Sequence, residues 1–334
     1  MHDNRIPVID IAPFFSGNKS SKHIVGRQVD AALRTIGFMT IVGHGVPGAL
    51  IQRARSTALE FFNGSLAEKM QIARTPEQPS RGYSWVGNRS LAYSLGQQAP
   101  PDLQEGFAMG PIDMGHDADD SDPDAARFFA PNLWPERPAA LREVLEAYYR
   151  DMARLATTLM RIFAVGLDLP EAYFADKIDQ HTSVLRAIHY PPQVETPEPD
   201  QLRAGAHTDY GTLTILYGDD TPGGLQVRHR HGDWMDVHPT PGSLVCNIGD
   251  LMARWTNDRW VSNLHRVVNP PRDYADMDRL SIPFFHNPNH NAEIRCIASC
   301  LGPHGIAKYP PVRFSDHYLG KLTKAEHMRL DVEN

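Results

Sequence analysis

The chain has 334 residues, of which 41% are hydrophobic, so it is long enough for one large domain or two ordinary ones. Its formal net charge of −7 disfavours nucleic acid and anionic membranes as partners, because positive charge is not in excess. The first residues lack the basic start and long apolar run of a signal peptide, and no apolar run reaches the length of a membrane span. Three cysteines without a CxxC pair predict neither a disulfide framework nor a thiolate zinc site, so a cytoplasmic location is expected.

The first half of the chain predicts alternating strands and helices. Ser20 or Ser21 is the predicted N-cap of the first helix, and Pro47 suits the first turn of the second. Segment 77–132 is rich in Pro, Gly, Ser and Asp, which predicts loop with short elements. The predicted strands cover 6–11 and 38–42, and the predicted helices cover about 20–36, 47–62 and 138–165.

After Thr182 the chain changes to short apolar or alternating runs separated by turn residues. Several runs at this spacing are typical of an antiparallel sandwich or barrel, so we expect helices packed outside a mainly antiparallel β core in a single domain. A hairpin turn is predicted at Gly232, with His229 and His231 as solvated loop residues. The predicted strands cover 183–190, 212–217, 224–229, 234–238, 243–249, 264–268 and 279–285.

The stretch HTDYGTLTIL (207–216) predicts a buried strand that begins with two residues costly to bury. On a strand, His207 and Asp209 point to the same face and form half of a metal site. A single histidine–aspartate motif of this kind also occurs in proteins where it binds no metal. His265 in the strand-like LHRVVNPP supplies a second imidazole. Two histidines and one carboxylate leave three positions of an octahedral ion open, as in non-haem iron(II) oxygenases. By contrast, His286 and His290 are interpreted as turn residues after the last strand.

A second pair of polar residues lies in RLSIPFFHNPN. Arg279 and Ser281 are two apart on a strand with apolar neighbours, so their side chains face the same way. An arginine there can hold a carboxylate by two charge-assisted hydrogen bonds while the hydroxyl adds a third. The alternative is an arginine paired with a structural aspartate, and the two residues alone leave both interpretations open.

Several stretches in the same order resemble the isopenicillin N synthase-like family of Fe(II)/2-oxoglutarate-dependent dioxygenases. They are IPVIDI, IGFMTIVGHGVP, RGYSWVG, HTDYGTLTIL, PGSLVCNIGDLMARWTNDRWVSNLHRVVNP and DRLSIPFFHNPN. The resemblance implies an α+β fold: a distorted double-stranded β-helix, or jelly roll, with flanking α-helices. It also implies one oxygenase domain over 1–334, with a helical and loop part over about 1–180, a jelly-roll core carrying the metal site over about 181–290 and a C-terminal segment over 291–334.

The resemblance also implies roles for single residues. His207, Asp209 and His265 would bind Fe(II), and no catalytic residue is expected beyond these ligands. The distal carboxylate of the cosubstrate 2-oxoglutarate would be bound by Arg279, Ser281 and Tyr190. With O2, such an enzyme oxidises a small organic molecule, by default through hydroxylation, and releases succinate and CO2. A carboxylate at 209 disfavours halogenation, which needs that position open.

The resemblance places the substrate entrance in segment 81–113, where RGYSWVG, LAYSLG and DLQEGF lie. Ile188 stands where many plant members have an asparagine, which implies a more apolar pocket wall. Each aromatic residue and each arginine proposed here has an ordinary packing or salt-bridge alternative. The substrate candidates are Tyr83, Trp85, Phe107, Arg186, Ile188 and Phe285, with Tyr93 and Arg89 as further possibilities.

Two other classes of function compete with the dioxygenase. An iron oxidase of the same family that does not use 2-oxoglutarate would also contain the Arg-x-Ser pair. A non-enzymatic jelly-roll binding protein could hold zinc at the triad, but structural zinc usually has four protein ligands and this site offers three. The expected partner is a small-molecule substrate, and both a monomer and a dimer are compatible with the composition.

Overall fold

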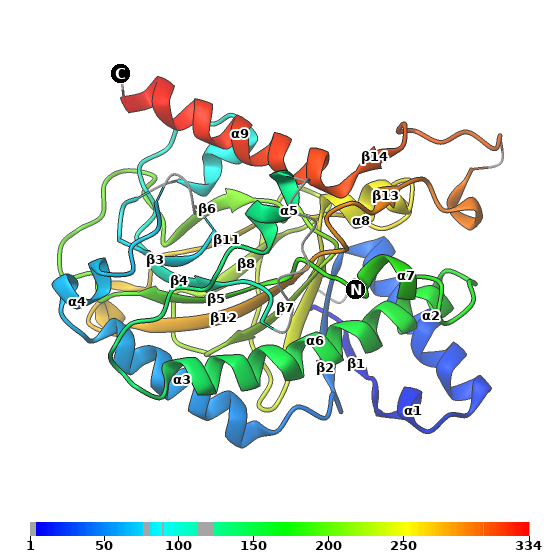
Figure 1. The fold of residues 1–334 in the computed structure, drawn as a ribbon, viewed down its shortest axis with the longest axis horizontal. Helices are drawn as coiled ribbons and strands as arrows, with labels where there is room; N and C mark the ends of the chain where they lie inside the picture. The colour runs from blue at the N-terminus through cyan, green and yellow to red at the C-terminus, as the bar shows by residue number, and fades with distance from the viewer. Residues whose placement is uncertain (1–4, 76–79, 89, 113–122, 303, 334) are drawn as a thin grey trace.

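Two β-sheets face each other in the computed structural model, and long helices cover the outer side of the larger sheet (Figure 1). The structure describes residues 5–75, 80–88, 90–112, 123–302 and 304–333. Phe38 and Val245 of the larger sheet pack with Leu225 and Val227 of the smaller one, so an apolar core lies between the sheets.

The larger sheet has eight strands within the described residues, and strands from the first 110 residues extend both of its edges. β1 pairs with β2 in parallel, whereas the other neighbours pair antiparallel. Its order is β1 (Val8–Asp10), β2 (Phe38–Val42), β10 (Leu244–Ile248), β7 (Leu213–Gly218), β12 (Arg279–His286), β5 (Val184–Tyr190), β4 (Glu105–Met109) and β3 (Gly82–Ser84).

The smaller sheet is antiparallel and contributes two of the histidines discussed above. Its order is β6 (Ala204–His207), β11 (His265–Val267), β8 (Leu225–Arg228) and β9 (Trp234–Asp236). β13 (Glu293–Ile294) and β14 (Val312–Arg313) form a separate pair near the C-terminus.

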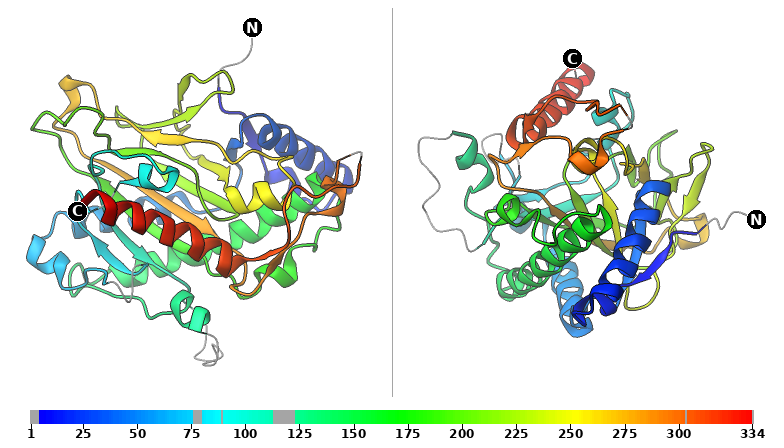
Figure 2. Two further views of the ribbon diagram at one scale, coloured as in Figure 1. Left: turned by 90° about the horizontal axis from the view of Figure 1, so that it is seen from above. Right: turned by 90° about the vertical axis from the view of Figure 1, so that its right-hand side faces the viewer.

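Helices lie on both sides of the sheets. α2 and α3 pack on α6, whereas α9 lies on the opposite side of the molecule, next to η1 (Figures 1 and 2). The helices are α1 (Ala12–Phe15), α2 (Lys19–Thr35), α3 (Gly48–Phe62), α4 (Leu66–Met70), α5 (Pro123–Phe128), α6 (Leu141–Gly166), α7 (Ala175–Ile178), α8 (Asp250–Trp255) and α9 (Phe314–Glu333). The short 3-10 helices are η1 (Leu91–Leu95), η2 (Arg272–Tyr274) and η3 (Ala298–Cys300).

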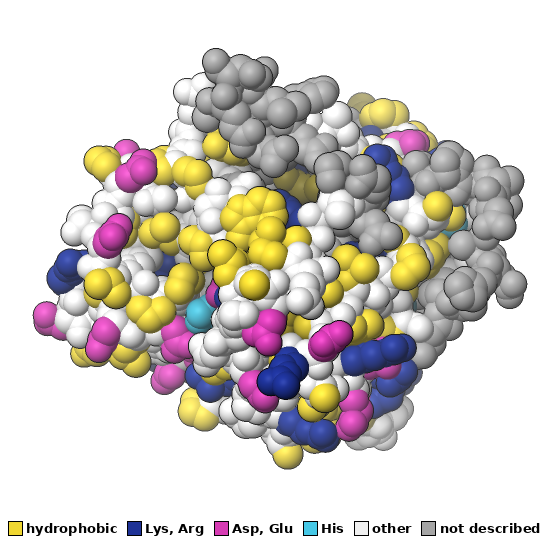
Figure 3. Space-filling view, turned by 60° about the vertical axis from the view of Figure 1, so that its left-hand side comes forward, with side chains coloured by type: hydrophobic (Ala, Val, Ile, Leu, Met, Phe, Trp, Pro, Cys, Tyr) yellow, Lys and Arg dark blue, Asp and Glu magenta, His cyan; other side chains and the backbone are white. Residues whose placement is uncertain are grey.

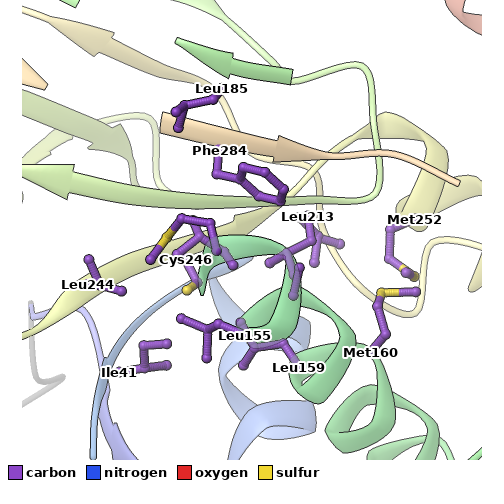
Figure 4. Close-up of a cluster of buried hydrophobic side chains, with 14 of the residues drawn as sticks. Ile41, Leu155, Leu159, Met160, Leu185, Leu213, Leu244, Cys246, Met252 and Phe284 are labelled. Carbon is purple, nitrogen blue, oxygen red and sulfur yellow. The ribbon is translucent and has the colours of Figure 1, made fainter. Parts of the chain in front are cut away.

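The two-residue period of the strands decides which side chains face the helices. Leu213 of β7 and Phe284 of β12 point outward and pack against Leu155 and Leu159 of α6 (Figure 4). Residues in between, such as Thr214, point into the space between the sheets. Burial of this apolar face against α6 therefore fixes the register that orients the polar inner face.

Most predicted elements are present, with three informative differences. Asn18, not Ser20 or Ser21, caps α2: its side-chain oxygen accepts hydrogen bonds from the amides of both serines, at 2.8 and 3.4 Å. The sequence analysis did not predict β6 as a separate strand. His286, predicted to lie in a turn, is the last residue of β12 and is fully buried.

Positive and negative side chains are intermixed on the face shown in Figure 3. No helix among the described residues is both long and apolar enough to cross a membrane. The three cysteines are free thiols, and the cytoplasmic location stays a prediction.

We expect the buried pair His181 and His286 to make stability depend on pH. Their ring centroids lie 5.4 Å apart, and Ser183 Oγ lies 2.9 Å from His286 Nδ1. Burial lowers the pKa of both imidazoles, and the nearby His181 lowers that of His286 further. Each ring is neutral in the fold but gains a proton in the unfolded chain below about pH 6.5, so stability present above that pH is lost on acidification.

The free energy of unfolding should therefore fall by up to roughly 1.4 kcal/mol per pH unit for each such histidine as pH drops below about 6.5. Denaturant titrations between about pH 7.5 and 5.5 measure this slope. His286→Gln should give a shallower slope than the original chain, and equal slopes would contradict the assignment.

Candidate metal centre and cosubstrate site

Two strand ends of the smaller sheet and the turn after β6 bring the triad together. His207 is the last residue of β6 and pairs in register with His265, the first residue of β11. Their ring centroids are 4.3 Å apart, and His265 Nε2 lies 3.7 Å from Asp209 Oδ1. One potential ligand atom from each residue lies within 4.8 Å of the others. Asp209 lies in the segment after β6 and not on the strand, so the strand alternation assumed from sequence does not explain its position beside His207.

Backbone carbonyls orient both imidazoles. His207 Nδ1 lies 2.8 Å from the carbonyl oxygen of Gly205, and His265 Nδ1 lies 3.1 Å from that of Asn263. A carbonyl only accepts, so each Nδ1 carries the proton and donates it. Each Nε2 is then left as a lone-pair donor for a metal ion.

The carboxylate of Asp209 is held from two neighbouring strands. Thr214 Oγ1 of β7 and Asn247 Nδ2 of β10 both donate to Asp209 Oδ2, at 2.5 and 2.6 Å. Burial by itself favours the neutral acid, but the two imidazoles and these two hydrogen bonds lower the pKa of Asp209 below its ordinary value. Asp209 is therefore ionised, with Oδ1 directed toward His265.

One row of the larger sheet lies beneath this carboxylate. Asn247 pairs with Thr214, and Thr214 pairs with Phe285 on β12. Because these residues are paired in register, their side chains project from the same face of the sheet. Phe285 is thereby placed next to the residues that hold Asp209.

A buried cationic pocket lies further along the same inner face. Arg279 is 3% exposed, and its Nε and Nη1 are buried with no hydrogen-bond partner among the described residues. Arg279 pairs with Tyr190, and the Tyr190 hydroxyl lies 3.5 Å from Ser281 Oγ. Asp219 Oδ1 lies 3.6 Å from Arg279 Nε, beyond hydrogen-bond distance. The structure thus leaves unused donors beside two hydroxyls, a donor set suited to a carboxylate.

A glycine gives Arg279 its space. Gly218 pairs with Ser281 on the same inner face, and a Cβ atom at Gly218 would lie 3.2 Å from Arg279 Nη2. On the other side of β12, Ser281 pairs with Ile188. The carboxylate pocket is therefore bordered by glycine on one strand and by an apolar side chain on the other.

The structure brings only some of the predicted substrate residues to this inner face. Arg186 and Ile188 share the face of Tyr190 on β5, and Phe285 shares the face of Ser281 on β12. Ile188 also contacts the apolar cluster around Tyr190.

Tyr83 and Phe107 are corrected by the structure. They pair with each other on β3 and β4, belong to the outer core and contact the ring of Phe61 on α3. Because side chains alternate along β4, Gly106 and Ala108 lie on the inner face, opposite Ile188 and Arg186 of β5.

The other aromatic candidates are not brought to the triad by any strand register. Trp85 follows β3 and is 40% exposed, whereas Tyr93 is buried in η1. Arg89 lies outside the described residues.

Comparison with known proteins defines the class. Residues 181–288 match the 2OG-Fe(II) oxygenase superfamily, and residues 6–137 match the family described as non-haem dioxygenase in morphine synthesis N-terminal. The chain belongs to the 2OG-Fe(II) oxygenase superfamily and is a 2-oxoglutarate-Fe(II)-dependent dioxygenase. The predicted family and the α+β jelly-roll fold with flanking helices are confirmed.

Individual relatives cover nearly the whole chain. Homoarginine-6-hydroxylase 2-ODD-233 of Oryza sativa subsp. japonica is 33% identical over 95% of this chain and 96% of its own. The 2-oxoglutarate-Fe(II) type oxidoreductase hxnY of Emericella nidulans is 33% identical, covering 94% of this chain and 88% of its own. The crystal structure of a full-length Neurospora crassa protein in complex with alpha-KG and thymine has a TM-score of 0.83 and 28% identity, covering 99% of this chain and 98% of its own.

The residues present fit the cofactors of this class, which are Fe(II), 2-oxoglutarate and O2. Two imidazoles and one ionised carboxylate form a donor set for iron(II). The unpaired donors of Arg279 suit the distal carboxylate of 2-oxoglutarate. These findings disfavour both the oxidase without 2-oxoglutarate and the non-enzymatic binding protein.

Sequence analysis did not find Thr214 or Asn247. The only signal was a polar residue at an inward position of an otherwise apolar strand.

Removing the side-chain donor of Thr214 or of Asn247 should weaken Fe(II) binding by about 10–100-fold, because the carboxylate of Asp209 loses its orientation. Anaerobic Fe(II) titration of Thr214→Val and Asn247→Ala measures the effect.

Thr40→Val is the matched control, because Thr40 is equally buried in β2 of the same sheet. Its Fe(II) affinity should stay within about twofold of the original. If the Thr214 and Asn247 variants bound iron as tightly as the control, the orienting role of these donors would be wrong.

Proposed function

We propose that the chain oxidises a small organic molecule that carries an anionic group, by default through hydroxylation, and that Arg186 binds that group. The observation that carries the proposal is the placement of two guanidinium groups on the inner faces of β5 and β12, Arg186 and Arg279. In this proposal Arg279 binds the distal carboxylate of 2-oxoglutarate. A second anion bound at this inner face would therefore contact Arg186.

The spacing along β5 supports this division. Arg186 is four residues from Tyr190, which corresponds to about 13 Å along an extended strand. The space between them is lined by Ile188, and Phe285 lies beside the residues that hold Asp209. A substrate held by Arg186 would therefore contact an apolar wall near the metal ligands.

The residues have separate tasks in the reaction. His207, Asp209 and His265 hold the iron, and Arg279, Ser281 and Tyr190 bind the distal carboxylate of 2-oxoglutarate. When bound, iron(II) and O2 supply the oxidative decarboxylation of 2-oxoglutarate to succinate and CO2 and the oxidation of the substrate. Ile188 and Phe285 exclude water from the apolar side of the site.

The relatives support a small molecule as the substrate. The name of the rice relative refers to homoarginine, and the fungal structure contains thymine. Homoarginine, as an amino acid, carries an anionic group, whereas thymine does not. The proposal of an anionic substrate therefore depends on the position of Arg186.

The test of this function is a screen for substrate-dependent release of succinate. With Fe(II), 2-oxoglutarate and O2 present, small carboxylates and amino-acid derivatives should raise succinate release above the level without substrate. Matched amides and esters should not. Stimulation by uncharged compounds alone would contradict an anionic substrate.

For any carboxylate that stimulates turnover, Arg186→Gln should raise its KM by about 10–100-fold, because a charge-assisted bond is lost. The KM for 2-oxoglutarate should stay within about twofold. Arg228→Gln, at the exposed end of β8, is the control and should leave both values unchanged. An unchanged substrate KM in Arg186→Gln would remove Arg186 from the substrate site.

A further inference from the structure

A second buried arginine, Arg203, lies beside the cosubstrate pocket. It directly precedes β6 and has no exposed surface. Its Nη1 donates to the carbonyl oxygens of Pro222 and Gly223, at 3.2 and 3.0 Å, and its Nη2 donates to that of Met277, at 3.0 Å. One guanidinium therefore joins the loop after β7 to the turn before β12.

Those two segments border Arg279. Gly224 continues the first segment, and a Cβ atom there would lie 3.8 Å from Arg279 Nε. Met277 lies two residues before Arg279 in the second segment. Arg203 thus fixes the backbone on both sides of the cosubstrate arginine.

Both guanidinium groups also contact one aromatic ring. The central carbon of Arg203 lies 5.9 Å from the centroid of Tyr190, and that of Arg279 lies 5.3 Å from it. Like Arg279 Nε and Nη1, Arg203 Nε is buried without a hydrogen-bond partner among the described residues. The ring of Tyr190 thus lies near two guanidinium groups, and each of them has at least one N–H group without a hydrogen-bond acceptor among the described residues.

The local charges do not balance without an added anion. Asp219 lies 3.6 Å from Arg279 Nε, but it also lies 3.8 Å from Arg55 Nη2. Asp278 is 42% exposed at its side chain and lies 3.3 Å from His189 Nε2. Burial and the neighbouring Arg279 lower the pKa of Arg203 to about 10, so Arg203 stays charged at neutral pH. A buried excess of positive charge is costly, and a bound carboxylate offsets it.

We infer that Arg203 is a positioning residue of the cosubstrate site, which provides a second positive charge for the distal carboxylate and holds the segments around Arg279. Its consequence is selectivity for a 2-oxo diacid over a 2-oxo acid without the second carboxylate. The inference concerns the cosubstrate and does not depend on the substrate proposed above.

The competing explanation is that Arg203 only fastens loops, and the chain contains a matched control for it. Arg81 is likewise buried, at 2% exposed, and donates to the backbone carbonyls of Ser80, Phe128 and Ala130. It directly precedes β3, an edge strand of the larger sheet that is separated from β12 by β4 and β5. Arg81→Gln therefore removes the same kind of loop fastening without removing charge from the cosubstrate pocket.

The experiment measures dissociation constants of two 2-oxo acids from the Fe(II)-loaded protein without O2, through the visible charge-transfer band of the bound 2-oxo acid. The acids are 2-oxoglutarate and 2-oxopentanoate, which differ by the distal carboxylate. Since no substrate is needed, failure here is separate from failure of the proposed function.

Arg203→Gln should raise the dissociation constant of 2-oxoglutarate by about tenfold or more and change that of 2-oxopentanoate by less than about threefold. Arg203→Lys keeps the charge but loses the planar fork, so it should retain part of this preference. Arg81→Gln should lower Tm and leave the preference at its original value.

Two results would overturn the inference. One is equal weakening of the binding of both acids in Arg203→Gln, as general destabilisation of the fold predicts. The other is an unchanged preference for the diacid in this variant. If Arg203→Gln does not fold, Arg203→Lys is compared with Arg81→Gln. The inference then requires a smaller preference for 2-oxoglutarate over 2-oxopentanoate in Arg203→Lys than in Arg81→Gln, and equal preferences would contradict it.

Discussion

The site depends on the buried carboxylate of Asp209 and the two hydrogen bonds that keep it ionised. Thr214 and Asn247 are neighbours in register on β7 and β10, so one row of the larger sheet fixes an oxygen that belongs to a turn of the smaller sheet. Without these donors and the two imidazoles, burial would favour the neutral acid, which is a poor ligand. The outer apolar contacts with α6 keep that row in register.

The same alternation also separates the tasks along β5 and β12. Arg279, Ser281, Pro283 and Phe285 alternate along β12 and share its inner face, so the cosubstrate pocket continues from the row that supports the metal ligands. Apolar residues in between, such as Ile282, face the helices and stabilise the sheet. Stability and chemistry therefore use opposite faces of the same strands.

Sequence patterns predicted the helices α2, α3 and α6 and most strands, because their apolar periods are regular, but not the 20-residue helix α9. They did not predict β6, a short strand of small residues, nor the cap of α2 by Asn18. The histidines and the arginine–serine pair were found through residue chemistry and family resemblance. Thr214 and Asn247 act through pairing between distant strands, and Tyr83 and Phe107 were misplaced because the face of a short strand cannot be deduced without its register.

The triad and Arg279 are proposed to form one site for iron(II) and 2-oxoglutarate, and every other assignment rests on this. The most direct measurement is anaerobic addition of Fe(II) and then 2-oxoglutarate to the metal-free protein, followed by visible absorption. We predict a weak metal-to-ligand charge-transfer band that forms at low 2-oxoglutarate concentration in the original chain and only at much higher concentration in Arg279→Met. Iron binding without this band, or a band with the same concentration dependence in Arg279→Met, would contradict the shared site.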